Sequence, residues 1–420
     1  MSKDYMTDGR ASWITYADPK GSVFVVDKNP WEHPLTIEDQ LALITDVRGV
    51  AIFRKVFTVH DIKNARIDAT ALGVFDLWCN GQRVGRRTND GSVEFDELKP
   101  GWTDFRKRVL YYSYDITSYI REGENVLLVA VAPGWYNGRI ALGTYGKTHV
   151  SFLGALRLLD GAGDRTVYTD DSWDAYWGGH IRAGDIWDGE LCDGREPSYA
   201  EMSLISERDI EWDTPTVESY DIFVTPHIGP TVKARAWLYR KPVSIQIYDG
   251  TVDNGTDHGA INVVRIIDDH DTFSLKKGER AIIDFGQNVV GYPVFTVRCA
   301  AGTQVTVRVS EMLNDSGDNT RLNDGPAGSL HTVNYRSAKA KISYIARGDQ
   351  NGETYRPTFT YLGFQYCEFL ATDDVEITGL TAAVVGSDTR ETGRIETSHK
   401  DINKLILYHR TPCFIYNPYQ

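Results

Sequence analysis

The sequence has few cysteines, and their placement does not suggest that they act together. Its 420 residues include 5 cysteines and 10 histidines, both widely scattered. The cysteines are odd in number and form no Cys-x-x-Cys pair, so they predict neither a disulfide framework nor a zinc site. The histidines are isolated and lack the close spacing of metal ligands. These residue types therefore predict no resident metal.

Long hydrophobic runs are also missing. The segment Met1–Trp13 has no apolar core of signal-peptide length, and no stretch of the sequence is apolar for long enough to span a bilayer. The formal net charge is −13, which repels phosphate backbones and anionic lipid surfaces. We expect a cytoplasmic protein whose partners include neither nucleic acid nor a membrane. A neutral ligand such as a sugar is compatible with this charge.

The motifs of several enzyme classes are absent as well. There is no Gly-x-Gly-x-x-Gly, no P-loop and no Gly-x-Ser-x-Gly. Their absence argues against dinucleotide binding, against nucleotide-phosphate binding and against the serine of an α/β-hydrolase. Internal repeats and low-complexity segments are not found either, so a solenoid or propeller is not expected.

Alternation of polar and apolar residues dominates what is present. In Gln304–Ser310 three valines share one face and polar side chains the other, which predicts a half-buried strand. Val126–Ala132 is apolar on both faces, which predicts a central strand. Asn80-Gly81, between two apolar stretches, is a strong hairpin signal. Short strands separated by such turns are typical of a β-sandwich or barrel and not of a parallel α/β sheet.

Only the end of the sequence has a convincing helical pattern. Ile402 and Leu405 follow Ser398 at helical spacing, and Ser398 with Asp401 fits a capping box. A break in the strand pattern at Trp212–Pro215 marks a boundary. We therefore expect an all-β fold with two tandem, jelly-roll-like β-sandwich domains, residues 1–215 and 216–395, and a short helical stub at 396–420.

Several short motifs follow one another in a specific order. They are Ala71–Gly81, Leu98–Arg108, Gly134–Arg139, Asp170–Trp173, Asp185–Glu190, Asp284–Gly291 and Tyr361–Tyr366. Each motif is weak alone, but the ordered series resembles the N-terminal sandwich and the following sandwich of bacterial α-L-rhamnosidases. The resemblance covers roughly residues 50–410.

The resemblance implies membership of a glycoside hydrolase family that acts on rhamnose-containing glycans or glycosides. In that family the hydrolytic site lies in an (α/α) toroid that follows the two sandwiches. We expect this chain to end before the toroid, so no catalytic residue can be carried over. The family is enzymatic, but the chain alone is expected to be inactive.

A catalytic site of the chain's own would require a suitable pair of carboxylates. Glycoside hydrolysis usually needs two carboxylates about 5–9.5 Å apart. The adjacent pairs Asp170/Asp171, Asp268/Asp269 and Asp373/Asp374 do not indicate that geometry, because neighbours on a strand point to opposite faces. Glu311, at the end of the strand predicted at 304–310, can either lie in a cleft or be a solvated strand end.

The loop Gly134–Arg139 is the best candidate for binding a sugar. Trp135 or Tyr136 can stack on the apolar face of a sugar, and Asn137 and Arg139 can bind its hydroxyls. The alternative is that Trp135 closes the end of the core or an interdomain seam. Trp187, beside acidic residues, is similar in kind, with a domain contact as its alternative.

The resemblance also raises the possibility of a calcium site in the first sandwich. In some relatives the first sandwich binds rhamnose with calcium, through an Asp-Asn pair ahead of a hairpin and a later Asn. These positions correspond loosely to Asn80 and Asn137, but Cys79 stands where the acid would be. Since a thiol is a poor calcium ligand, we expect no cofactor.

Three functions remain open from the sequence. We favour a non-catalytic module that binds or positions rhamnose-containing glycans. The alternatives are an α-L-rhamnosidase with an unrecognised site and a ligand-free remnant of a split gene. The stub is expected to promote self-association, because Ile402, Leu405, Ile406 and the apolar residues of Cys413–Tyr419 need cover.

Overall fold

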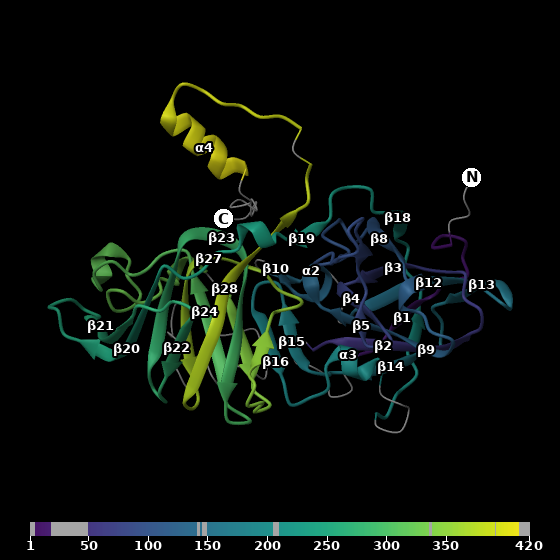
Figure 1. Ribbon diagram of the computed structural model, residues 1–420, viewed down its shortest axis with the longest axis horizontal. Helices are drawn as coiled ribbons and strands as arrows, with labels where there is room; N and C mark the ends of the chain where they lie inside the picture. The colour runs from purple at the N-terminus through teal and green to yellow at the C-terminus, as the bar shows by residue number, and fades with distance from the viewer. Residues whose placement is uncertain are drawn as a thin grey trace. The chain divides into compact units, whose positions relative to one another are not determined.

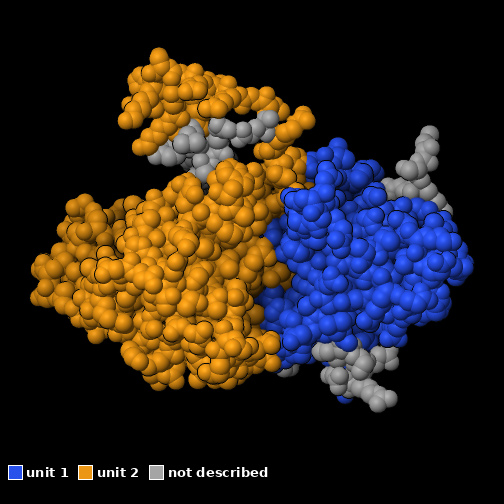
Figure 2. Space-filling view, viewed as in Figure 1, with its two compact units in different colours: residues 1–25, 44–186, 196–229 blue, residues 26–43, 187–195, 230–420 orange. Residues whose placement is uncertain are grey.

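The computed structural model describes residues 5–17, 49–140, 143–144, 149–204, 210–335, 338–390 and 392–410. The chain forms two compact units, coloured separately in Figure 2. Unit 1 comprises Met1–Val25, Ile44–Ile186 and Glu196–Gly229, and unit 2 comprises Val26–Leu43, Trp187–Arg195 and Pro230–Gln420. The short segment Trp187–Arg195 thus belongs to unit 2 although the segments before and after it belong to unit 1.

Unit 1 is a sandwich of two mainly antiparallel sheets (Figure 1). One sheet contains β1 (Trp13–Thr15), β3 (Asn64–Leu72), β8 (Arg108–Asp115), β12 (Ser151–Asp160), β13 (Gly163–Tyr168), β17 (Thr216–Glu218) and β18 (Phe223–Pro226). The other contains β2 (Ala51–Val59), β4 (Val74–Cys79), β5 (Gln82–Arg83), β9 (Gly123–Ala132) and β14 (Asp174–Trp177).

Alternation along β12 explains two separate apolar clusters in unit 1. Phe152 and Leu156 point into the main core with residues of β2, β4 and β9. Leu153 and Ala155 have the opposite parity and join a second, smaller cluster. The second cluster also contains residues from outside the strands, including residues of the predicted binding loop.

The remaining elements of unit 1 are short. They are β6 (Arg86–Arg87), β7 (Val93–Glu94), η1 (Thr117–Tyr119), α2 (Gly134–Asn137), β10 (Arg139–Ile140), β11 (Gly143–Thr144), β15 (Ile181–Asp185) and α3 (Tyr199–Met202). The expectation of strands and loops before residue 398 missed α2 and α3. In α3 the Ser198 side chain accepts from the Glu201 backbone and Glu201 reaches back to Ser198, a complete capping box.

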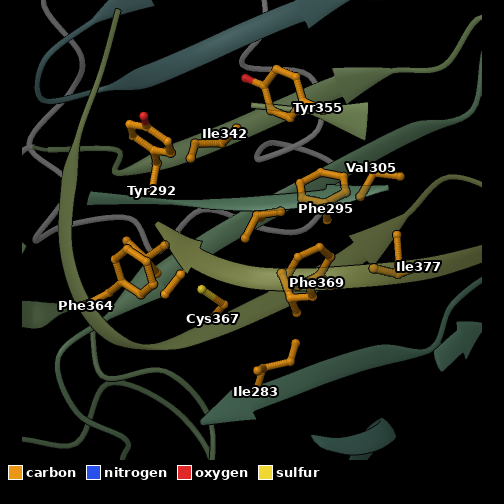
Figure 3. Close-up of a cluster of buried hydrophobic side chains, with 14 of the residues drawn as sticks. Ile283, Tyr292, Phe295, Val305, Ile342, Tyr355, Phe364, Cys367, Phe369 and Ile377 are labelled. Carbon is orange, nitrogen blue, oxygen red and sulfur yellow. The ribbon is translucent and has the colours of Figure 1, made fainter. Parts of the chain in front are cut away.

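Unit 2 is a second sandwich, built around a larger core. One layer contains β16 (Gly189–Asp193), β20 (Ser244–Val252), β21 (Ala260–Ile267), β24 (Gln304–Ser310), β25 (Lys341–Ile345) and β27 (Leu362–Ala371). The other contains β19 (Val232–Ala234), β22 (Thr272–Leu275), β26 (Glu353–Tyr355) and β28 (Val375–Ser387). The core includes the aromatic side chains of Phe295, Phe364 and Phe369 (Figure 3).

A single strand, β23 (Arg280–Cys299), belongs to both layers of unit 2. Its first half pairs with β27 and its second half pairs with β28. Gly291 is the crossing point, since it lies opposite Leu362 of β27 and Val384 of β28. A Cβ at Gly291 would lie only 1.7 Å from the carbonyl oxygen of Ala383, so the crossing requires glycine.

Unit 2 also contains η2 (Ala236–Leu238), η3 (Asn319–Arg321), η4 (Val333–Tyr335) and α4 (Lys400–Arg410). The helix predicted near the end is therefore confirmed as α4. Its cap differs from the prediction, because Thr397 Oγ1 accepts from the backbone N–H of His399, and Asn403 Nδ2 donates to the Thr397 carbonyl.

The predicted fold class is confirmed: the protein is all-β with two sandwiches and a short C-terminal helix. The strand predicted at Gln304–Ser310 is β24, and the central strand predicted at Val126–Ala132 is the end of β9, which pairs with β2 and β4. Asn80 and Gly81 have φ values of +50° and +85° in the turn from β4 to β5, as the Asn-Gly signal predicted.

Candidate functional site

The loop after β9 forms the short helix α2. Gly134 opens it with a φ of +53°, and a Cβ there would lie 2.3 Å from Cγ2 of Val74. Glycine is required at this position both for the backbone angle and for the close approach to β4. The Asn137 N–H donates to the Pro133 carbonyl at 3.0 Å, which closes the turn.

Most of the loop side chains that were predicted to bind a sugar face the protein. Tyr136 is 5% exposed, and its ring meets that of Phe105 edge-on with centroids 5.5 Å apart. Asn137 is 6% exposed. Trp135 is half-buried and packs against the second apolar cluster of unit 1. Arg139 begins β10, and its side chain lies outside the described residues. Trp135 is therefore the member of the loop with the most accessible ring.

Asn80 holds the turn between β4 and β5 in place. Its Nδ2 donates to the Tyr119 carbonyl at 2.8 Å and to Oδ1 of Asn125 at 2.7 Å, and its Oδ1 accepts from the Val126 N–H at 2.9 Å. Cys79, in the position of the missing acid, is fully buried, and this burial raises the pKa of its thiol to about 12. In the described ranges, no three His, Cys, Asp or Glu side chains lie close enough to share a metal ion.

The structure does not bring Asn80 and Asn137 together. In the register of β4 and β9, Cys79 lies opposite Leu127 and Val74 lies opposite Ala132. Asn80 follows the first of these pairs and α2 follows the second, so they lie at opposite ends of β9. The six residue steps from Val126 to Ala132 span about 20 Å. One monosaccharide or one ion cannot reach both side chains.

Trp187 belongs to unit 2 and precedes β16. Its carbonyl accepts from the Ala340 N–H at 3.1 Å, and the side chain of Asp188 accepts from the Lys339 N–H at 3.1 Å. Both hydrogen bonds connect this segment to the residues just before β25. The strand β16 pairs with β25 in a parallel arrangement. Trp187 is half-buried in the segment that leads into β16.

Glu190 lies in β16 and is a buried acid with a shifted pKa. It is 3% exposed and accepts from the Tyr355 hydroxyl at 3.0 Å and from the N–H groups of Thr358 and Phe359 at 2.9 and 2.8 Å. Burial outweighs these donors and raises the pKa of Glu190 to about 7. These hydrogen bonds connect β16 to the segment that precedes β27.

Sequence reasoning missed a buried ionic network in unit 1. Asp76 accepts from Lys99 Nζ and from Arg83 Nε, both at 2.6 Å, and Arg83 also lies 3.2 Å from Glu97. Burial by itself would raise the pKa of Asp76, but Arg83 and Lys99 hold it below its ordinary value. The available signal was an acid in the middle of the apolar strand Val74–Cys79, because a buried acid needs a cationic partner.

Comparison with known families assigns both units. Residues 60–222 match the α-L-rhamnosidase N-terminal domain, and residues 274–386 match the bacterial α-L-rhamnosidase concanavalin-like domain. These are domains of glycoside hydrolases. The chain belongs to the bacterial α-L-rhamnosidase family, as the ordered motifs predicted, and it carries these two β domains.

Individual relatives are similar over most of this chain. An α-L-rhamnosidase of Streptomyces avermitilis is 32% identical over 350 residues, covering 82% of the chain and 29% of the relative. One from Formosa agariphila is 30% identical, covering 84% of the chain and 33% of the relative. The chain thus spans about a third of the length of these curated relatives.

Solved structures have the same fold. The S. avermitilis α-L-rhamnosidase, crystallised with L-rhamnose, has a TM-score of 0.65 and 28% identity, covering 86% of this chain and 31% of that one. The α-L-rhamnosidase of Dictyoglomus thermophilum has a TM-score of 0.67 at 24% identity and covers 94% of this chain and 38% of its own. Within the described residues, no helix has the length and apolar character needed to cross a membrane.

Proposed function

We propose that this chain is a non-catalytic part of an α-L-rhamnosidase-like glycoside hydrolase and that it binds or positions rhamnose-containing glycans. The observation that carries the proposal is the pair of family matches, both to β domains, in a chain that spans about a third of its relatives. The crystallised S. avermitilis relative has a sequence 28% identical to this chain, and its structure was solved in complex with L-rhamnose.

The environment of the buried carboxylates supports a non-catalytic role. Asp76 is paired with two cations, and Glu368 lies 3.4 Å from Arg280 and 3.2 Å from Arg308. A glycosidase needs an acid and a second carboxylate that both reach the scissile bond. Carboxylates paired with neighbouring cations in this way do not provide a proton to a substrate.

The Trp135 ring is the proposed sugar platform of unit 1. It is half-buried against the second apolar cluster, so its orientation is fixed before a ligand binds. A preoriented aromatic ring loses little conformational freedom when it stacks on a sugar. Trp187, half-buried just ahead of β16, is a second candidate ring.

The enzyme alternative has one specific observation in its favour. Glu190 has a pKa raised to about 7, which is the range of a general acid. Against this role, its carboxylate is 3% exposed and receives three hydrogen-bond donors of the protein. The ligand-free remnant is the third possibility.

Two measurements distinguish these functions. Purified protein is first assayed with an aryl α-L-rhamnoside, and we expect no turnover above the uncatalysed rate. Turnover that disappears in Glu190→Gln would instead establish the enzyme. Calorimetric titration with L-rhamnose then separates a binding module from a remnant. We expect saturable binding in the millimolar to micromolar range, equivalent to about −4 to −8 kcal/mol.

A further inference from the structure

Three segments of unit 2 that are distant in sequence lie next to one another. They belong to β23, to β27 and to the end of β24. Figure 1 shows these strands side by side, and their register pairs Asp284 and Ser310 with Tyr366 on either edge of β27. The segments include the motifs Asp284–Gly291 and Tyr361–Tyr366, which identified the family but have no part in the proposed function of unit 1. Glu311 directly follows β24 and is the third contributor.

A wide bulge in β23 displaces side chains from the sheet. Asp284 lies opposite Tyr366 and Val289 lies opposite Phe364, so residues 285–288 face the single residue Gln365. Phe285 points into the core, while Asn288 is partly exposed. Bulges re-aim side chains and are frequent beside binding sites. The bulge thus places the Asn288 amide outside the core.

Asn288 and Glu311 form a pair that retains unused acceptors. Asn288 Nδ2 donates to Oε1 of Glu311 at 3.2 Å. Oδ1 of Asn288 is covered and has no hydrogen-bond partner among the described residues. Within the described residues, Glu311 accepts a side-chain hydrogen bond through Oε1, and Oε2 accepts none. Buried polar groups are normally satisfied, so the covered Asn288 Oδ1 is unusual, whereas Glu311 Oε2 is not among the covered atoms and is open to a ligand.

Gly363 keeps the neighbouring position on β27 free of a side chain. It is exposed and lies opposite Val290 of β23. A Cβ built on Gly363 would lie 3.5 Å from Oε1 of Glu311, which is ordinary van der Waals contact. A small side chain therefore fits without distortion, whereas a larger one would cover the carboxylate. Next to it, Gln365 Nε2 donates to Asp284 Oδ1 at 2.9 Å and to the Tyr366 hydroxyl at 3.0 Å.

We propose that Glu311, Asn288 and Gly363 form a carbohydrate-binding site on unit 2. Glu311 accepts hydrogen bonds from sugar hydroxyls through Oε2, Asn288 positions the carboxylate through its Nδ2, and Gly363 leaves room for the sugar. A sugar hydroxyl that donates to Oε2 of Glu311 uses the one acceptor of the pair that is open to a ligand. The two carboxylates, Glu311 and Asp284, disfavour an anionic ligand. This site is separate from Trp135 and does not depend on the proposed function of unit 1.

The test is titration of the full chain with L-rhamnose, with variants that alter the site in different ways. Glu311→Gln removes the charge and one acceptor. Gly363→Val keeps the carboxylate and covers it, at an exposed strand position where a β-branched residue is well tolerated. In a Trp135→Ala background, which removes the loop platform of unit 1, we expect each to weaken L-rhamnose binding at least tenfold without lowering the melting temperature. Glu376→Gln on β28 and Gly393→Val, at an exposed glycine with open space around it, are the matched controls and should bind as the parent does.

A double-mutant cycle tests the positioning role of Asn288. Asn288→Ala should weaken binding in the parent but have almost no further effect in the Glu311→Gln background, because both changes act on one contact. Equal effects in the two backgrounds would contradict the positioning role. Parent-like binding by both Glu311→Gln and Gly363→Val, with loss only in Trp135→Ala, would overturn the site on unit 2. Absence of saturable binding by the parent chain would also overturn it.

Discussion

Lys99 Nζ lies 2.6 Å from Oδ1 of Asp76, and the two side chains are 0% and 3% exposed. The contact is reinforced by the backbone, because the Phe75 N–H donates to the Lys99 carbonyl at 2.7 Å. Arg83 completes the charge balance at the second oxygen of Asp76. The network therefore fixes the segment around Lys99 to the edge of the sheet that contains β4.

Breaking this pair should strongly destabilise unit 1. Lys99→Met leaves Asp76 with one cation fewer in a buried site, which typically costs about 3–5 kcal/mol of unfolding free energy. Urea denaturation of the parent and the variant measures the difference. The control is Lys276→Met, because Lys276 and Asp374 are 71% and 54% exposed and such pairs contribute about 0–1 kcal/mol. Equal losses in both variants would contradict the buried network.

Glu190 should make stability depend on pH. Its pKa is about 7 in the folded protein and about 4.3 when unfolded, so between these values the folded state binds more protons. The unfolding free energy therefore falls as pH rises through this window, by roughly 4 kcal/mol at about 1.4 kcal/mol per pH unit. Denaturation at several pH values should show a smaller fall in Glu190→Gln. An unchanged slope in Glu190→Gln would disprove the assignment.

Trp135→Ala should remove sugar binding at the loop of unit 1 while the fold survives. The ring is half-buried, so its loss removes the stacking surface and part of one contact with the second apolar cluster. The measurement is L-rhamnose titration in a Glu311→Gln background, which isolates the loop. Trp237→Ala is the matched control, since that tryptophan is 65% exposed in unit 2. If Trp135→Ala unfolds the protein, the ring closes the core and is not a binding platform.

Ending the chain after Arg394 should reduce self-association. Ile402 and Leu405 on α4 are 45% and 55% exposed, and Ile395 ahead of the helix is 69% exposed. Each large apolar side chain left in water forgoes roughly 1.5–3 kcal/mol of burial, which favours association between chains. Light scattering should show more monomer for the shortened chain, with an almost unchanged melting temperature. The remaining apolar residues of the predicted stub, Cys413–Tyr419, lie outside the described residues. A monomeric parent that melts several degrees lower after shortening would show that α4 is packed.

Local sequence patterns determined the elements that depend on neighbours along the chain. The alternation in Gln304–Ser310 predicted β24, and Asn80-Gly81 predicted a tight turn because few residues tolerate positive φ. The ordered motifs determined the family. The capping box of Ser198 and Glu201 was an equally local signal, and it was overlooked because α3 is only four residues long.

The tertiary structure decided which distant residues meet. No local pattern reveals that β23 changes sheet at Gly291, that Lys99 pairs with Asp76, or that Trp135 packs on the cluster formed by one face of β12. Register also separated Asn80 from Asn137 and joined Asn288 with Glu311. The physical reason is that periodicity specifies which face of a strand is buried, whereas the neighbour across the sheet is set by non-local pairing and packing.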